Sequence, residues 1–158
     1  MTNEMKQQFT YRITNANSTE LVVILYDMAL CYTEEGEQAY NAGKEPELKE
    51  AIRKTRNCIN ELMQSLDLKY EPAPTLLKIY LFCIRRLAQS EVHHDNTCFA
   101  DIKKVIEPLR DAYQEIASRN KNGAVMGNSQ VVYAGLTYGK NQLSENMADQ
   151  GSNRGMMA

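Results

Sequence analysis

Apolar side chains recur every three or four positions over residues 17–117 of this 158-residue chain, a spacing typical of amphipathic helices. The first run begins with Asn17 and Glu20, whose spacing is that of a capping box. In a capping box each side chain accepts a hydrogen bond from the backbone N–H of the other residue. Gly43 takes the left-handed conformation at little cost, so this helix is predicted to end near Ala42. Its apolar stripe is Leu21, Leu25, Met28, Tyr32 and Ala39.

Three further runs predict three further helices, over about residues 46–66, 75–91 and 96–117. Pro46 suits a first helical turn, where its missing N–H is not needed. Residues 67–74 hold two prolines and are predicted to form a loop. Pro108 lies inside the last run, where it removes one backbone hydrogen bond at a cost of about 3 kcal/mol, so we expect a kink or break there.

Four helices joined by short connections pack most simply as an antiparallel bundle. The sequence therefore predicts an all-α fold: an antiparallel four-helix bundle over residues 17–117, a flexible N-terminal arm at 1–16 and a Gly/Asn-rich C-terminal tail at 118–158. Six of the eight glycines follow Ser118, and this composition buries too little apolar surface to fold alone.

One apolar patch interrupts the polar tail, at residues 131–136 (VVYAGL). Short apolar patches in such segments are typical of recognition motifs. Two interpretations stay open: the patch folds back onto a groove of its own bundle or of a neighbouring molecule, giving self-association through the tail, or it has no function.

Charge excludes several classes of partner. Residues 1–117 carry 14 Lys/Arg against 18 Asp/Glu, and the tail carries 4 against 2, so neither part has the one-signed field expected of a nucleic-acid or anionic-membrane binder. No run approaches 18 apolar residues, and the opening MTNEMK contains no apolar signal region. We expect a soluble, cytoplasmic protein with no membrane insertion.

The sequence offers little for metal or cofactor binding. Its cysteines, Cys31, Cys58, Cys83 and Cys98, form no Cys-x-x-Cys pair and are expected to be structural thiols. His93, His94, Asp95 and Cys98 cluster at a helix junction, but a structural zinc site would need a second ligand pair, and none is visible. We expect no metal and no cofactor.

The same two histidines support an alternative function, a histidine-phosphotransfer-like signalling bundle. Both lie at a helix end beside Glu91 and Asp95, whose charge would repel a phosphoryl donor. No Gly-x-Ser-x-Gly motif, phosphate-binding glycine loop or pair of carboxylates on an apolar stripe is present, so we expect no enzyme.

Arg85 and Arg86 end the third apolar run and have two interpretations. They either pair with a neighbouring acid and offset the helix dipole, or one of them fixes a partner's carboxylate or carbonyl beside an apolar groove. The tyrosines at helical spacing are open in the same way, between the edge of the core and the lining of a groove. These are Tyr26, Tyr32, Tyr80 and Tyr113.

The chain contains three separated motifs in a characteristic order. The first is residues 13–27 (ITNANSTELVVILYD), the second is Leu66-Asp67 with residues 76–87 (LLKIYLFCIRRL), and the third is residues 108–113 (PLRDAY). Together they resemble the motifs of the FliS family of flagellar export chaperones, over about residues 10–117. The chain has Ser18 where the family has Pro, Met28 where it has Gly and Tyr113 where it has Trp.

The resemblance implies a function. Members are antiparallel bundles that bind the disordered, apolar C-terminal segment of flagellin, prevent its premature polymerisation and keep it competent for flagellar type III export. It implies flagellin and the flagellar export apparatus as partners, and an arm at Phe9–Ile13 that occupies a cleft until the client arrives. The partner-binding residues expected from it are Tyr11, Ile13, Leu25, Tyr26, Leu66, Tyr80, Arg85, Arg86 and Leu87.

Overall fold

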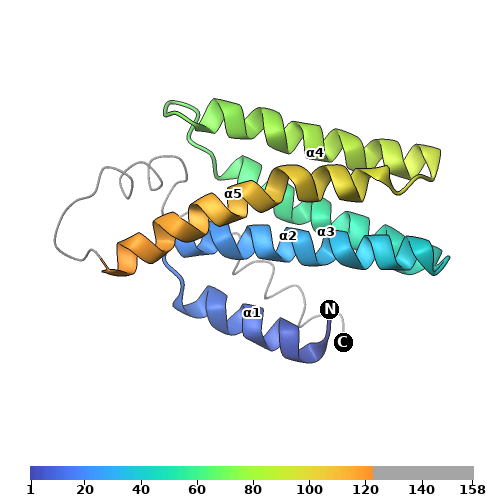
Figure 1. The fold of residues 1–158 in the computed structure, drawn as a ribbon, viewed down its shortest axis with the longest axis horizontal. Helices are drawn as coiled ribbons and strands as arrows, with labels where there is room; N and C mark the ends of the chain where they lie inside the picture. The colour runs from blue at the N-terminus through green and yellow to red at the C-terminus, as the bar shows by residue number, and fades with distance from the viewer. Residues whose placement is uncertain (123–158) are drawn as a thin grey trace.

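A computed structural model describes residues 1–122, which form five α-helices (Figure 1). These are α1 (Asn3–Asn15), α2 (Ser18–Asn41), α3 (Glu45–Gln64), α4 (Ala73–His93) and α5 (Thr97–Asn122). Helix α2 packs against α3 and α5, α4 packs against the same two helices, and α1 packs against α2. Helices α2–α5 therefore form an antiparallel bundle, and the predicted all-α fold is confirmed.

The expected start and stop signals of α2 are present. The Asn17 side chain accepts from the Glu20 N–H at 2.9 Å, and the Glu20 carboxylate accepts from the Asn17 N–H at 3.0 Å, which completes the capping box. Gly43 follows the helix end with φ of +67°, a conformation that glycine adopts without a Cβ clash. These features are local, which is why the sequence alone predicts them.

Helix α1 was not expected, because residues 1–16 were predicted to form a flexible arm. Thr2 caps it by accepting from the Met5 N–H at 3.3 Å. Met5, Phe9 and Ile13 recur at intervals of four, and Phe9 and Ile13 pack against the core. That stripe is the signal that would have predicted the helix.

Of the kink or break expected at Pro108, the break does not occur, since α5 continues from Thr97 to Asn122 without interruption. Pro108 and Lys104, whose carbonyl loses its helical partner, are both exposed. Water can satisfy that carbonyl at an exposed site, and the apolar stripe of α5 holds the helix on the bundle. Helix α5 also passes the expected boundary after residue 117, and the rest of the predicted tail, with its patch at 131–136, lies outside the described residues.

Helix α2 is the centre of the bundle, with six consecutive buried residues from Leu21 to Tyr26. A helix is buried all round only where neighbours cover every side, and here α3, α5 and α1 do so. Gly36 permits the close approach of α5, because a Cβ there would lie 2.6 Å from the Phe99 ring. The largest fully buried side chains are Tyr26, Tyr80, Phe99, Leu25, Ile52, Ile59, Leu62, Leu87, Ile102 and Ile106.

The four cysteines are free thiols, and three of them, Cys58, Cys83 and Cys98, are buried. Burial raises the pKa of Cys83 to about 12, so this thiol stays protonated and packs as a small apolar group. None of the helices in the part of the chain that the structure describes has the length and apolar character needed to cross a membrane.

Candidate functional site

Four of the expected partner-binding residues lie in the core: Leu25, Tyr26, Tyr80 and Leu87 are at most 1% exposed. The Tyr26 and Tyr80 hydroxyls are 2.5 Å apart, and the Tyr26 ring lies 5.8 Å from that of Tyr113. These contacts join α2 to α4 and α5 through the centre of the bundle. A partner would reach the four side chains only if the helices separated, so in this structure they are contacts of the core.

The remaining apolar candidates lie nearer the surface but not together. Leu66, just after α3, is half-buried and packs against the core. Ile13 packs against the core from α1 in the same way. Tyr11 is 73% exposed. These three residues therefore do not form one patch, and of the three only Tyr11 and Ile13 lie on the same helix.

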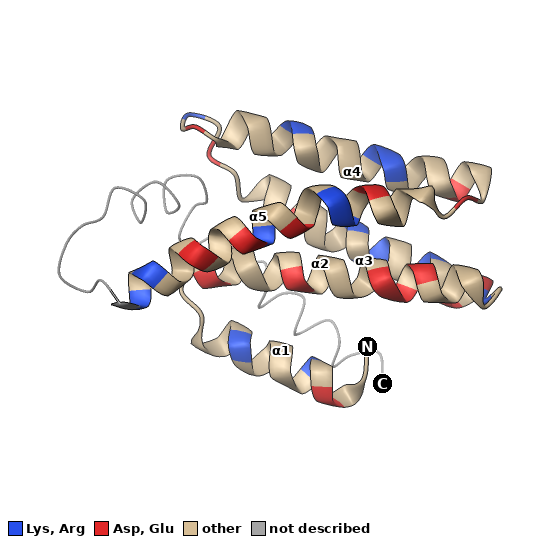
Figure 2. Cartoon of the chain, viewed as in Figure 1, with Lys and Arg blue, Asp and Glu red and all other residues tan. Residues whose placement is uncertain are grey.

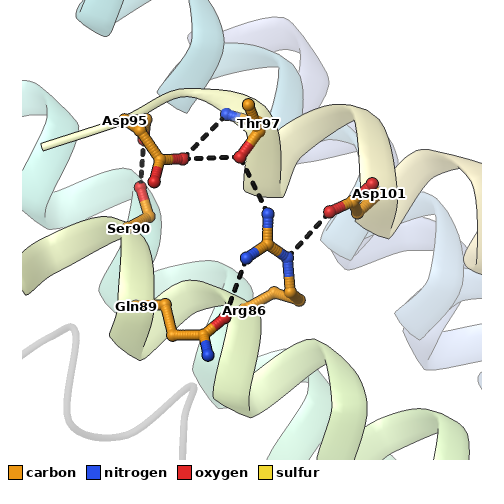
Figure 3. Close-up of polar contacts among 6 residues, drawn as sticks. All are labelled: Arg86, Gln89, Ser90, Asp95, Thr97 and Asp101. Carbon is orange, nitrogen blue, oxygen red and sulfur yellow. Dashed lines mark hydrogen bonds and ion pairs between the residues drawn. The ribbon is translucent and has the colours of Figure 1, made fainter. Parts of the chain in front are cut away.

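Arg86 joins α4 to the start of α5 (Figure 3). Its Nε donates to Asp101 at 2.7 Å, and its two terminal nitrogens donate to Gln89 and to the Thr97 hydroxyl, each at 2.8 Å. Thr97 in turn donates its hydroxyl and backbone N–H to Asp95, and this hydrogen bonding lowers the pKa of the Asp95 carboxyl. Arg86 thus fits the first interpretation, an arginine paired with a neighbouring acid.

Arg85 is exposed and makes no ion pair with any residue in the described range. It lies beside an apolar stripe on the outer side of α4, in which Leu81 is 47% and Val92 is 73% exposed. Figure 2 shows Lys and Arg but no acidic residue along α4 until Glu91. Arg85 therefore fits the second interpretation, a cation beside an apolar surface. The stripe is Leu77, Leu81, Ile84, Ala88 and Val92, spaced at helical intervals.

A cavity of about 390 Å³ lies between the end of α1, the start of α2 and the last turns of α5, and we call it the α1–α5 cavity. Val23, Ile24 and Ala117 give it an apolar floor, and all three are buried. Tyr11 stands at its rim with the polar side chains of α1 and α5. Its volume lies within the range of pockets that receive side chains or small ligands. The other lining residues are Arg12, Asn15, Ala16, Glu20, Gln114, Ser118 and Lys121.

An ion pair crosses this cavity's rim, since the Lys121 ammonium lies 2.7 Å from the Glu20 carboxylate. Burial alone would raise the pKa of Glu20, but hydrogen bonds from Lys121 and the Asn17 backbone, with the charge of Lys121, lower it below its ordinary value. Glu20 is therefore a carboxylate at neutral pH. It links the end of α5 to the start of α2.

Asp27 attaches α1 to the rest of the bundle. Its carboxylate accepts from Arg12 of α1 at 2.6 Å and from Arg110 of α5 at 3.3 Å, and only 18% of its side chain is exposed. The Arg12 guanidinium also lies over the Phe9 ring, 5.5 Å from its centroid. One carboxylate thus holds a cation from each of two helices.

Helix α1 covers one side of α2 without being buried itself (Figure 1). None of its residues is fully buried, although Phe9, Ile13 and the following Ala16 are half-buried against the core. Beneath it, α2 presents apolar Val23 and Ile24 beside Asp27. Helix α1 is therefore a covering helix that contributes modest burial to the core.

His93 and His94 lie at the end of α4, and both are exposed. His94 is the left-handed C-cap with φ of +50°, and its carbonyl accepts from the Tyr40 hydroxyl at 3.0 Å. Within residues 1–122 no group of three or more His, Cys, Asp and Glu side chains is placed to hold a metal ion. The pair therefore ends a helix and joins it to α2.

Sequence reasoning missed the residues that attach α1 and line the α1–α5 cavity, chiefly Arg12, Asp27, Lys121 and Val23. Arg12 and Asp27 are 15 positions apart, and no local spacing pairs them. One signal was available, because Asp27 is an acid within the apolar run of α2. Burying an unpaired carboxylate is costly, so a cation was to be expected beside it.

Comparisons with known proteins agree with the helical architecture. Residues 1–120 match the family described as "Flagellar protein FliS". The chain is 27% identical over 111 residues to the "Flagellar secretion chaperone FliS" of Bacillus subtilis (strain 168), a match that covers 70% of this chain and 84% of that protein. The matched family region includes all of α1–α4, most of α5 and most of the lining of the α1–α5 cavity.

Proposed function

This chain belongs to the FliS family of flagellar proteins, and we propose that it is a non-enzymatic flagellar export chaperone whose client is the C-terminal segment of flagellin. In this function it binds that segment in the cytosol, prevents premature polymerisation and delivers flagellin to the flagellar export apparatus. The observation that carries the proposal is the apolar surface of α2 that α1 covers.

The proposed client site includes the α1–α5 cavity and the surface beneath α1. An amphipathic segment that lacks a partner in solution would place its apolar residues on Val23 and Ile24. Ordering such a segment costs about 2–5 kcal/mol of the gross interaction energy, so a chaperone needs more apolar area than the cavity alone offers. Displacing α1 would supply that area.

The attachments of α1 support this exchange. The helix has no fully buried residue, and its ion pair to the bundle joins Arg12, which is 40% exposed, to Asp27. A second attachment lies just before the helix, where Met1 packs against the core and its terminal ammonium pairs with Glu35. Because no side chain of α1 is fully buried, the helix contributes less apolar burial than any of α2–α5 and is held less tightly. A client that replaces these contacts offsets the cost of removing α1, and its apparent affinity equals its intrinsic affinity multiplied by the fraction of molecules in which α1 is detached.

Among the expected site residues, those at the surface have direct roles in this proposal. Tyr11 and Ile13 belong to the displaced helix, and Arg85 offers a cation beside the outer stripe of α4 for a carboxylate of the client or the export apparatus. The helices of the bundle are held together in part by four core side chains, Leu25, Tyr26, Tyr80 and Leu87. Leu66 packs against the core just after the end of α3. Arg86 fixes the junction of α4 and α5.

The test is calorimetric titration of the full chain with monomeric flagellin and with flagellin lacking its last ~40 residues, a length set by an extended-wrap binding mode. We expect binding of the intact protein and loss of binding on truncation. Equal affinity for both, or no binding to either, would contradict the proposal. A flagellin truncated by the same length at its N-terminus is the matched control and should bind normally.

A further inference from the structure

The last helix ends at the edge of the α1–α5 cavity. Helix α5 lines it with Gln114, Ala117, Ser118 and Lys121, and the helix ends one residue later at Asn122. Residues 123–158 therefore continue the chain from the rim of an apolar hollow. Any apolar segment that follows closely starts next to a site that could receive it.

Such a segment follows within ten residues. Val131 is nine positions after Asn122, and an extended chain spans at most about 3.3–3.6 Å per residue, so the connection reaches about 30 Å. The cavity is in contact with Lys121 itself, so this length is sufficient for the chain to turn back. Gly123 and Gly127 lie in the connection, and glycine adopts the backbone conformations that tight turns need.

The chemistry of the segment matches the cavity. Residues 122–139 carry no charged side chain, and the patch at 131–136 (VVYAGL) contributes Val131, Val132, Tyr133 and Leu136. The apolar floor of Val23, Ile24 and Ala117 receives such side chains, and the segment brings no charge of its own into a cavity whose lining also includes Arg12, Glu20 and Lys121. The amide and hydroxyl groups of Asn15, Gln114 and Ser118 line the same cavity and can hydrogen-bond an extended backbone.

We propose that residues 131–136 bind in the α1–α5 cavity of their own bundle. Tethering raises the local concentration of the segment to the millimolar range, so weak intrinsic affinity is enough to occupy the site. The consequence for the client rests on the proposed function: flagellin must displace the tail as well as α1. The tail then acts as an internal competitor that releases the client more readily at the point of delivery.

The docking test needs no client. Methyl NMR of the full chain is compared with a Val132→Asp/Leu136→Asp variant and with a control, Leu143→Asp/Met147→Asp, which adds the same charges at the same spacing outside the patch. We expect the Val23 and Ile24 methyl resonances to shift in the first variant and to stay unchanged in the control. No shift, or equal shifts in both variants, would overturn the proposal. A shift that grows with protein concentration would mean docking onto a neighbouring molecule and would overturn it too.

The competition test is separate. If the tail occupies the cavity in about nine tenths of molecules, the first variant should bind flagellin about tenfold more tightly than the full chain, and the control should not. Unchanged affinity in the first variant would overturn the competition. Failure of every variant to bind flagellin would contradict the proposed client, while the methyl shifts would still decide whether the tail docks.

Discussion

Arg85 and Arg86 are adjacent on α4 but have different surroundings. Arg86 donates to Gln89 on its own helix and to Thr97 and Asp101 across the junction of α4 and α5, whereas Arg85 has no ion pair within the described range. We expect Arg86→Ala to lower the free energy of unfolding by about 1–2 kcal/mol, because it leaves Asp101 and Thr97 without this donor. Arg85→Ala should change it by less than about 0.5 kcal/mol. Urea denaturation measures both, and equal losses would contradict the assignment.

Glu20 should make stability depend on pH. Its pKa is lower in the folded protein than the ordinary value of 4.5, so its contribution is full above that pH and is lost as pH falls through the folded pKa. The Glu20→Gln substitution keeps a side-chain oxygen that can accept from the Asn17 N–H at the start of α2. It removes the negative charge beside Lys121 and the N-terminus of that helix. We expect the variant to be less stable by about 0.5–1 kcal/mol at pH 7, and we expect this difference to shrink as the pH falls from 4.5 to 3.

Denaturation at pH 7 and at pH 3 measures this difference. Glu107→Gln, an exposed acid on α5, is the control for a general effect of removing a negative charge. If Glu20→Gln loses the same stability at pH 3 as at pH 7, the ion pair at the rim of the cavity does not have the role assigned here.

At the scale of elements, the packing of α2 against α5 depends on Gly36. Alanine favours a helix over glycine by about 1 kcal/mol, yet a Cβ here would lie 2.6 Å from the Phe99 ring, which is fully buried. We expect Gly36→Ala to destabilise the bundle by about 1–3 kcal/mol, since the ring must shift within a packed core. Thermal unfolding measures it. Gln38→Ala, exposed on the same helix, should be neutral or stabilising, and a stabilised Gly36→Ala would contradict the close approach.

The attachment of α1 gives a second prediction at this scale. Arg12→Ala removes the ion pair to Asp27 and the contact with the Phe9 ring. We expect faster hydrogen exchange in the amides of α1, with α2–α5 unchanged, because α1 opens separately from the core. Lys6→Ala on the same helix is the control. Unchanged exchange in α1 would show that Arg12 does not hold it.

The elements that the sequence predicted have strong local signals. The stripe of α3 and the capping box of α2 are examples, because each depends on residues within one helix. Helix α1 was missed because its stripe has one apolar residue per turn and no residue that becomes fully buried. The helix does not break at Pro108 because tertiary packing and an exposed position compensate for a lost hydrogen bond.

At the scale of the whole molecule, the candidate site combines residues that are far apart in sequence. Glu20 and Lys121 meet at the cavity rim, and Asp27 joins Arg12 to Arg110. No spacing rule predicts such contacts, which arise when antiparallel packing brings the end of α5 beside the start of α2. The motifs predicted the family, but they named core residues such as Tyr26 and Tyr80 as partner contacts, and these lie in the interior.

The central claim is that the apolar surface of α2 beneath α1 receives the C-terminal segment of flagellin. Hydrogen exchange of the chain, alone and saturated with flagellin, tests it directly. The account predicts that amides of Asn3–Asn15 exchange faster in the complex, while those of residues 20–27 stay protected. Unchanged or slower exchange throughout α1 in the saturated complex would contradict it.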